Sequence, residues 1–262
     1  MTVAFLEKGQ GTPLVLLHGI GSAARSFAAQ LDGLSARWRV VAWDAPGYGR
    51  STALAMEHPT AADYAGALER LLDESGIQRF HLLGHSLGCL MAAAFAARDP
   101  DRVLSLTLCS IAGGHGSLPA IERQRLLDQR LNDVAALGPR GMAEKRAPRL
   151  LGPAAPPEAL AKLVDTMGAV RPDGYAQAAR MLSTGDIVAD IRRFSPTLAG
   201  QVIYGDSDVI TPPARNREIA AQWPKADVHE IAGAGHALYL EQPAAFNALV
   251  DDFVLKRTGT PS

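Results

Sequence analysis

Residues 80–97 read FHLLGHSLGCLMAAAFAA. The segment opens with the apolar run FHLL, which predicts a short strand, and closes with an alanine-rich stretch, which predicts a helix. Between them, residues 84–88 form a G-x-S-x-G pattern, typical of a tight strand-to-helix turn with an exposed serine hydroxyl. A Cβ atom at Gly84 or Gly88 would collide with the neighbouring strand or helix, so the turn requires glycine at both places. Ser86 is therefore a candidate nucleophile, at a helix N-terminus that favours a developing negative charge.

Composition limits the classes of function. The chain has 262 residues, 47% of them hydrophobic, with 26 basic and 27 acidic side chains. One α/β domain with a large core fits this length, and the balanced charge gives no polybasic surface for nucleic acid or membrane. Cys89 and Cys109 are in no metal-ligand spacing and are expected to be buried, reduced thiols.

The sequence also carries expectations about location and partners. The N-terminus lacks a basic segment followed by a long apolar one, and no stretch approaches the ~18 apolar residues of a membrane helix. We therefore expect a cytoplasmic monomer or homodimer that acts on a small molecule. No metal, cofactor, nucleic acid or membrane partner is expected.

Strand-like and helix-like patterns alternate along most of the chain. Apolar runs typical of buried strands are residues 14–17, 39–43, 80–83, 103–109, 201–204 and 227–231. Helical spacing of apolar residues marks 22–34, 60–75 and 243–255. This alternation predicts an α/β fold with a mostly parallel central sheet flanked by helices.

The pattern changes in the middle of the chain. Between residues 114 and 184 the strand-like runs disappear, and helical patterns take over, interrupted at Gly138-Pro139. We interpret this segment, called the insertion below, as a helical lid placed after the sixth strand. The core would then consist of residues 1–113 and 185–262, within one structural domain.

The residues that a serine nucleophile needs occur in the expected order. A serine hydroxyl requires an imidazole to take its proton, and the imidazole requires a carboxylate. For a G-x-S-x-G turn the chain order is serine, acid, histidine. Asp208 and His236 each follow a predicted strand at the same sheet edge as Ser86. Asp206 is the competing acid, with an alternative role as an acceptor for the backbone of its own loop.

Two backbone N–H groups must point at one place to form an oxyanion hole. The residue after the nucleophile, Leu87, is expected to supply one, and Ile20 the other, with Gly19 or Gly21 as alternatives. His85 flanks the nucleophile and is expected to form a wall of the site.

Five ordered motifs resemble the α/β-hydrolase fold. They are HGIG at 18–21, DAPGYGRS at 44–51, GHSLG at 84–88, GDSDVITP at 205–212 and GHALYLEQP at 235–243. The resemblance spans nearly the whole chain and implies a hydrolase of that fold. In the family pattern the acid is the second aspartate of G-x-x-D, which corresponds to Asp208. Glu241 and Pro243 match the family's cap of the final helix.

Subfamily likenesses are partial. Residues 173–176, DGYA, leading to Asp186, are similar to 3-oxoadipate enol-lactonases, which makes Tyr175 a substrate-binding candidate. The size and lid also resemble hydrolases that cleave carbon–carbon bonds in meta-cleavage products. Enol-lactonases usually carry Ser-Asn where this chain has Leu238-Tyr239, and the carbon–carbon hydrolases usually carry a G-N-S-M-G turn. Leu238 remains a candidate contact.

The sequence thus predicts a cofactor-free serine hydrolase that cleaves an ester or lactone through an acyl-enzyme. Carbon–carbon hydrolysis and perhydrolysis are alternatives, and a ligand-binding receptor is a third. Arginines of the insertion could bind a substrate carboxylate bidentately or could be solvated surface side chains. These arginines are Arg146, Arg149, Arg171 and Arg180.

Overall fold

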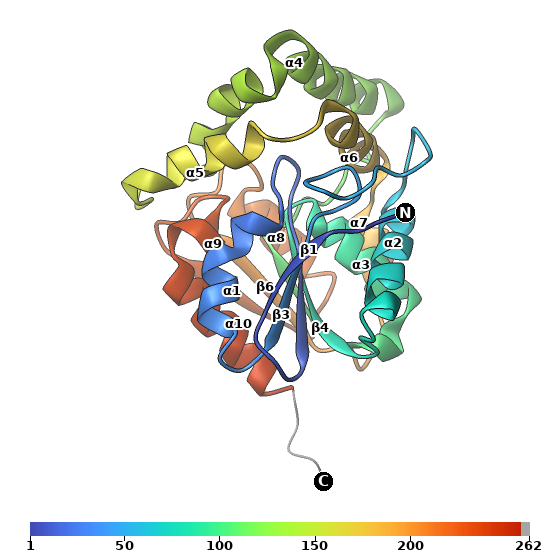
Figure 1. Cartoon of the computed structure of the whole chain (residues 1–262), viewed down its shortest axis with the longest axis vertical. Helices are drawn as coiled ribbons and strands as arrows, with labels where there is room; N and C mark the ends of the chain where they lie inside the picture. The colour runs from blue at the N-terminus through green and yellow to red at the C-terminus, as the bar shows by residue number, and fades with distance from the viewer. Residues whose placement is uncertain (258–262) are drawn as a thin grey trace.

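The computed structural model describes residues 1–257 and contains a twisted sheet of seven strands (Figure 1). The strands are β1 (Phe5–Lys8), β2 (Pro13–Leu17), β3 (Arg39–Trp43), β4 (Phe80–His85), β5 (Val103–Cys109), β6 (Gly200–Gly205) and β7 (Ala226–Ile231). Their order is β1-β3-β2-β4-β5-β6-β7, and every neighbouring pair is parallel except β1 with β3. The predicted mostly parallel sheet is confirmed.

Alternate residues of each central strand face two separate cores. In β2, Leu14 and Leu16 pack into one apolar cluster, and Val15 and Leu17 into the other. All four are at most 1% exposed. Burial on both faces explains why these strands appear in the sequence as continuous apolar runs.

Helices cover both faces of the sheet (Figure 1). Helices α1 (Ala28–Leu34) and α10 (Pro243–Leu255) pack on the face of Leu14, and α2 (Ala61–Glu74) and α3 (Gly88–Arg98) on the other. The shorter core helices are η1 (Ala24–Phe27), η2 (Pro100–Arg102), α7 (Ile187–Ile191), α8 (Pro213–Ala220) and α9 (Leu238–Glu241). No helix within residues 1–257 combines the length and the apolar character that crossing a membrane requires.

Local sequence signals explain the ends of α2. Thr60 and Asp63 form a capping box at its N-terminus, because each side chain bonds the other residue's backbone N–H. Gly76, with a φ of 66°, follows its C-terminus in the left-handed conformation that glycine adopts without steric cost. The predicted helix at 60–75 is confirmed with both signals in place.

Four helices lie between β5 and α7 and form the insertion: α4 (Ala120–Arg146), η3 (Ala147–Leu150), α5 (Pro157–Met167) and α6 (Pro172–Thr184). The prediction that the helical segment follows the sixth strand is wrong, because five strands, β1 to β5, precede it. Gly138 leaves helical geometry inside α4, with φ 66° and ψ 172°, as the Gly138-Pro139 break indicated.

The insertion is held against the core by backbone contacts. Ala237 N donates to Leu150 O over 3.0 Å. The backbones of Gly47 and Gly174 approach so closely that a Cβ on Gly174 would overlap Gly47 O. These contacts place α4, α5 and α6 over one end of the sheet, as Figure 1 shows at the top of the molecule.

Candidate active site

Ser86 occupies the strained corner between β4 and α3. Its φ is 52°, one of only two positive values at non-glycine positions within residues 1–257. A Cβ on Gly84 would lie 2.6 Å from Gly88 O, and one on Gly88 would overlap Leu17 O. The glycine requirement predicted from the sequence is thus confirmed. Strain of this kind persists only where the surrounding structure enforces it, and it is concentrated at functional sites.

Asp208 and His236 form a buried pair. His236 Nδ1 lies 2.8 Å from Asp208 Oδ2, and neither residue is more than 2% exposed. Because a carboxylate can only accept, Nδ1 carries the proton and Nε2 is left as an acceptor. The pair has the relationship expected of an acid and the imidazole that it orients.

The loop after β6 saturates the Asp208 carboxylate with donors. Oδ1 accepts from the N–H groups of Ile210 and Thr211 over 2.8 and 2.9 Å, and Oδ2 accepts from Thr211 Oγ1 over 2.7 Å. Burial alone raises the pKa of Asp208, but the hydrogen bond from His236 and those from Thr211 outweigh it and lower the pKa to about 2. Asp208 therefore stays ionised beside the imidazole.

Asp206 has a different role. Its Oδ1 accepts from Ser207 Oγ over 2.8 Å and from Gly233 N over 2.7 Å. Its backbone donor thus belongs to the neighbouring loop that follows β7, and not to its own loop as the sequence suggested. The structure assigns His236 to Asp208.

His85 packs against His236, with ring centroids 5.0 Å apart. Its Nε2 lies 2.9 Å from His236 O, so Nε2–H donates and Nδ1 is unprotonated. Nδ1 is buried and has no hydrogen-bond partner among residues 1–257. Burial first, and then the charge of His236, lower the pKa of His85 to about 3. His85 is a neutral wall residue that holds the backbone of the histidine loop.

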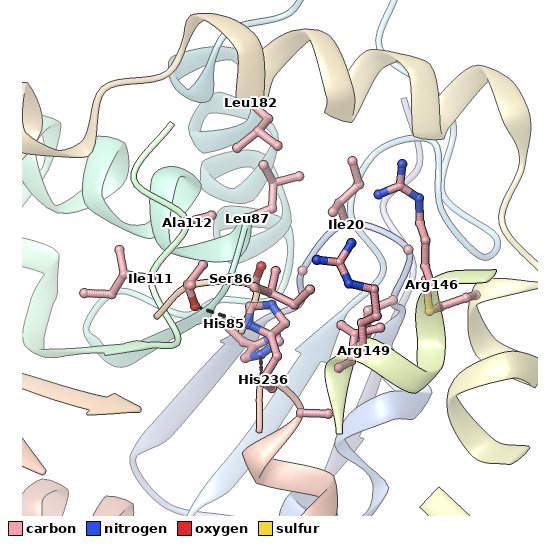
Figure 2. A pocket seen from close by; sticks show the side chains of 18 of the residues that line it. Ile20, His85, Ser86, Leu87, Ile111, Ala112, Arg146, Arg149, Leu182 and His236 are labelled. Atoms are coloured by element: carbon pink, nitrogen blue, oxygen red, sulfur yellow. Dashed lines mark hydrogen bonds between the residues drawn. The ribbon is translucent and has the colours of Figure 1, made fainter. Parts of the chain in front are cut away.

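A cavity of about 400 Å³ opens between the carboxyl edge of the sheet and the insertion. Ser86, His236 and Thr211 line it from the core, and Leu163 and Leu182 line it from α5 and α6. Figure 2 shows Ser86 and His236 together at its floor. The hydrogen bonds among described residues include none between Ser86 Oγ and His236, so the structure places these two side chains on one cavity without joining them.

The predicted oxyanion donors border the same cavity. Ile20 and Leu87 both line it, and the backbone N–H of neither donates a hydrogen bond to a residue of the described chain. Gly19 lies between Ser86 and His85: a Cβ there would come within 2.9 Å of Ser86 Cβ and 3.2 Å of His85 Nδ1. The backbone can approach Ser86 this closely only because residue 19 has no side chain.

The substrate-contact candidates divide into two groups. Gly19, His85, Arg146 and Tyr175 line the cavity. Arg171 and Leu238 do not. The Arg171 guanidinium donates to Ser51 O over 2.9 Å at the junction of insertion and core, and Leu238 is fully buried in the core cluster that contains α10.

The structure adds residues that sequence reasoning missed. Thr211 lies within the quoted GDSDVITP motif, but nothing in the pattern distinguished its hydroxyl from any other. Arg130 and Arg215 line the cavity from α4 and α8, which are far apart in the sequence. No cluster of three or more His, Cys, Asp or Glu that could hold a metal occurs in residues 1–257.

Two curated relatives illustrate the breadth of the chain's similarity. It is 31% identical over 256 residues to a "Putative carbamate hydrolase RutD" of Variovorax paradoxus, covering 96% of this chain and 94% of that protein. It is 32% identical to the dihydrolipoyllysine-residue acetyltransferase component of the acetoin cleaving system of Cupriavidus necator. There the match covers 95% of this chain but spans 65% of the relative's length.

Solved structures with the same fold include two hydrolases. A thermophilic esterase from Thermogutta terrifontis, with malate bound, superposes with a TM-score of 0.87 at 28% identity, covering 97% of this chain and 93% of that one. The enol-lactonase from Burkholderia xenovorans LB400 gives a TM-score of 0.86 at 26% identity, covering 97% and 96%.

The family itself is shown by a match over most of the sequence. The model of the alpha/beta hydrolase family matches residues 14–249, which run from β2 to α10 and include Ser86, Asp208 and His236. Together with the fold and the strained serine turn, this match leaves one assignment: the chain belongs to the alpha/beta hydrolase family.

Proposed function

We propose that the protein is a serine hydrolase that cleaves an ester or lactone through an acyl-enzyme. The observation that carries the proposal is the buried Asp208–His236 pair, which borders the cavity into which the strained turn presents Ser86. In this proposal Ser86 is the nucleophile, His236 the general base and Asp208 the residue that holds the imidazole.

The proposed reaction has two stages. Ser86 Oγ bonds to the carbonyl carbon while its proton passes to His236 Nε2, and the carbonyl oxygen becomes an oxyanion held by the N–H groups of Leu87 and Ile20. Collapse breaks the bond to the leaving oxygen, which receives the proton from Nε2. Water then attacks the acyl carbon and gives a proton to His236 Nε2. The bond to Ser86 Oγ breaks, the acid is released, and Nε2 returns the proton to Ser86 Oγ.

Residues 114–184 act as the lid in this proposal. Leu163 of α5 and Tyr175 and Leu182 of α6 line the cavity from the insertion side and limit its size. A partly closed cavity strengthens the hydrogen bonds to the oxyanion, because fewer water molecules compete for the same donors.

The test compares two serine variants on a chromogenic ester. Ser86→Ala should reduce kcat by about three or more orders of magnitude, since removal of a serine nucleophile leaves only binding and oxyanion stabilisation. Ser110→Ala is the matched control: Ser110 is also buried and at positive φ, at the end of the adjacent strand, but does not line the cavity.

Mass spectrometry of quenched turnover supplies a second readout. We expect a covalent adduct of acyl mass on Ser86 in the wild-type protein and in Ser110→Ala. Near-wild-type kcat in Ser86→Ala, or an adduct that maps elsewhere, would exclude the proposed nucleophile.

A further inference from the structure

Four guanidinium groups line the cavity around Ser86. The lining arginines are Arg130, Arg146, Arg149 and Arg215. None of the described residues that line the cavity is an aspartate or a glutamate. A neutral ester has no group that would use this excess of positive charge, whereas an anionic substrate does.

Two of the four arginines are already paired with acids outside the lining. Arg146 Nη2 bonds Asp133 Oδ2 over 2.6 Å, and Arg215 pairs with Glu218 over 3.1 Å. Asp133 also holds Lys145, which further fixes the position of Arg146. The Nε–H of Arg146 is buried and has no partner among residues 1–257. It is thus a donor that the protein leaves free.

Arg130 and Arg149 both leave the whole guanidinium available, because within residues 1–257 neither makes a hydrogen bond or an ion pair. Arg149 lines the cavity from η3, is exposed to solvent, and is the one that stands beside Arg146 in Figure 2. Figure 2 shows Arg149 and Arg146 on one side of Ser86, Ile111 and Ala112 on the other, and Leu182 above. Ser86 therefore stands between the Arg146–Arg149 pair and the apolar side chains of Ile111 and Ala112, whereas Arg215 lies near Gly113.

Carboxylates are the ligands that guanidinium groups such as those of Arg146 and Arg149 bind. A planar guanidinium bonds a carboxylate through two parallel N–H groups, and these charge-assisted bonds are about twice as strong as neutral ones. A carboxylate on the substrate would complete the pairing that the protein leaves open. An apolar remainder would fit against Ile111 and Leu182.

We propose that the substrate hydrolysed at Ser86 carries a carboxylate, which Arg149 binds with Arg146 beside it, and an apolar group on the opposite side of the scissile bond. This inference rests on the proposed function, since it names the substrate class of the same site. It gives Arg149 a recognition role that Arg171 and Arg180, which pair with Ser51 O and Glu57, do not share.

The experiment uses ester pairs that differ only in a carboxylate. One pair is mono-4-nitrophenyl glutarate and 4-nitrophenyl pentanoate, with the charge on the acyl side. The other is 4-(butanoyloxy)benzoate and phenyl butanoate, with the charge on the leaving group. For each pair we measure the charge preference, defined as kcat/KM of the ester that carries the carboxylate divided by kcat/KM of the neutral ester.

We expect the wild-type charge preference to exceed about 10 in at least one pair and Arg149→Gln to lower it about 10- to 100-fold, because hydrogen bonds to charged groups contribute on that scale. Arg149→Lys should retain part of it. The matched control is Arg125→Gln, since Arg125 is exposed on α4 and does not line the cavity. A wild-type charge preference at or below 1 in both pairs would overturn the inference. So would a charge preference in Arg149→Gln equal to that of the wild type.

Binding without turnover separates this inference from the proposed function. Glutarate is titrated by calorimetry into Ser86→Ala and into Ser86→Ala with Arg149→Gln. Saturable binding that weakens about 10-fold or more in the double variant supports the carboxylate site even if no ester is hydrolysed, in which case only the proposed function fails. Equal affinity of the two variants would overturn the carboxylate site, whatever the enzymatic result.

Discussion

Glu241 accepts a hydrogen bond from the backbone N–H of Gly152 over 2.7 Å. Both Glu241 carboxylate oxygens also lie 3.1 Å from Gly235 N, next to His236. One buried side chain at the end of α9 therefore joins the insertion to the loop that carries the proposed general base. Burial raises the pKa of Glu241, and these backbone donors oppose the increase.

Replacing Glu241 tests this connection. Glu241→Gln should lower the free energy of unfolding by about 1–3 kcal/mol. One carboxylate oxygen becomes an amide N–H₂, so the backbone N–H groups of Gly152 and Gly235 lose an acceptor. Urea unfolding measures the change. Glu144→Gln is the control, because Glu144 pairs with Arg140 at the surface and should cost under about 1 kcal/mol. Equal effects of the two substitutions would contradict the buried role.

Thr211 is expected to position Asp208. Thr211→Val preserves the shape of the side chain but removes the hydroxyl that donates to Asp208 Oδ2. We expect kcat to fall about 10-fold with little change in KM, since the loss corresponds to about 1–1.5 kcal/mol of orientation. Thr107→Val removes a buried hydrogen bond to Gln201 within the sheet and should reduce stability without reducing kcat.

The two aspartates of the loop after β6 should respond differently to amide substitution. Asp208→Asn should reduce kcat by about three to four orders of magnitude, because an amide cannot hold the imidazole in the tautomer that needs Nδ1–H. Asp206→Asn keeps an acceptor for Gly233 N and should leave kcat within about threefold. Steady-state kinetics on one ester suffices. A larger loss in Asp206→Asn would reverse the assignment of the acid.

Gly19→Ala should reduce kcat by at least about 10-fold, because the new Cβ would stand 2.9 Å from Ser86 Cβ and displace either the serine or the loop that carries Ile20. Gly66→Ala in α2 is the control: its Cβ would meet no atom closer than Arg98 Nη1 at 3.7 Å. That change should raise helix stability by about 0.5–1 kcal/mol and leave kcat unchanged. An unaffected kcat in Gly19→Ala would argue against a tight oxyanion loop.

Acid should destabilise the fold through two buried histidines. Burial lowers the pKa of His81 to about 4, and that of His85 is about 3. The unfolded chain binds these protons near pH 6.5, so stability is complete above that pH and is lost as pH falls from about 6.5 towards 4, by about 1.4 kcal/mol per pH unit for each histidine.

His81→Gln should therefore flatten the dependence of unfolding free energy on pH by about one histidine's share. Glutamine can keep a hydrogen bond to Ser105 Oγ, which lies 2.7 Å from His81 Nδ1. Urea unfolding between pH 7 and pH 4.5 measures the slope. His58→Gln, at an exposed site, should leave the slope as in the wild type, and a slope unaltered in His81→Gln would refute the assignment.

Much of the fold was predictable from short segments. The strand 103–109, the helix 243–255 and the serine turn depend on local features: apolar runs, turn glycines and helix spacing within a few residues. The breaks in the insertion were also visible, because glycine and proline interrupt helices wherever they stand. The count of six strands before the insertion was wrong, because only five form there, and the first, β1, is a short and mostly exposed edge strand that carries little apolar pattern.

What the sequence by itself determined was the fold class and the place of Ser86 at a tight strand-to-helix turn, because the glycines at 84 and 88 mark that turn locally. Only the tertiary structure decided which aspartate holds His236 and which arginines face the cavity. Asp206 and Asp208 are two residues apart, and Arg149 and Arg171 stand in the same insertion. Their roles differ because tertiary packing brings Asp208 to His236 and Arg149 to the cavity, whereas Asp206 and Arg171 find partners in neighbouring loops. No local sequence pattern encodes which way each side chain points.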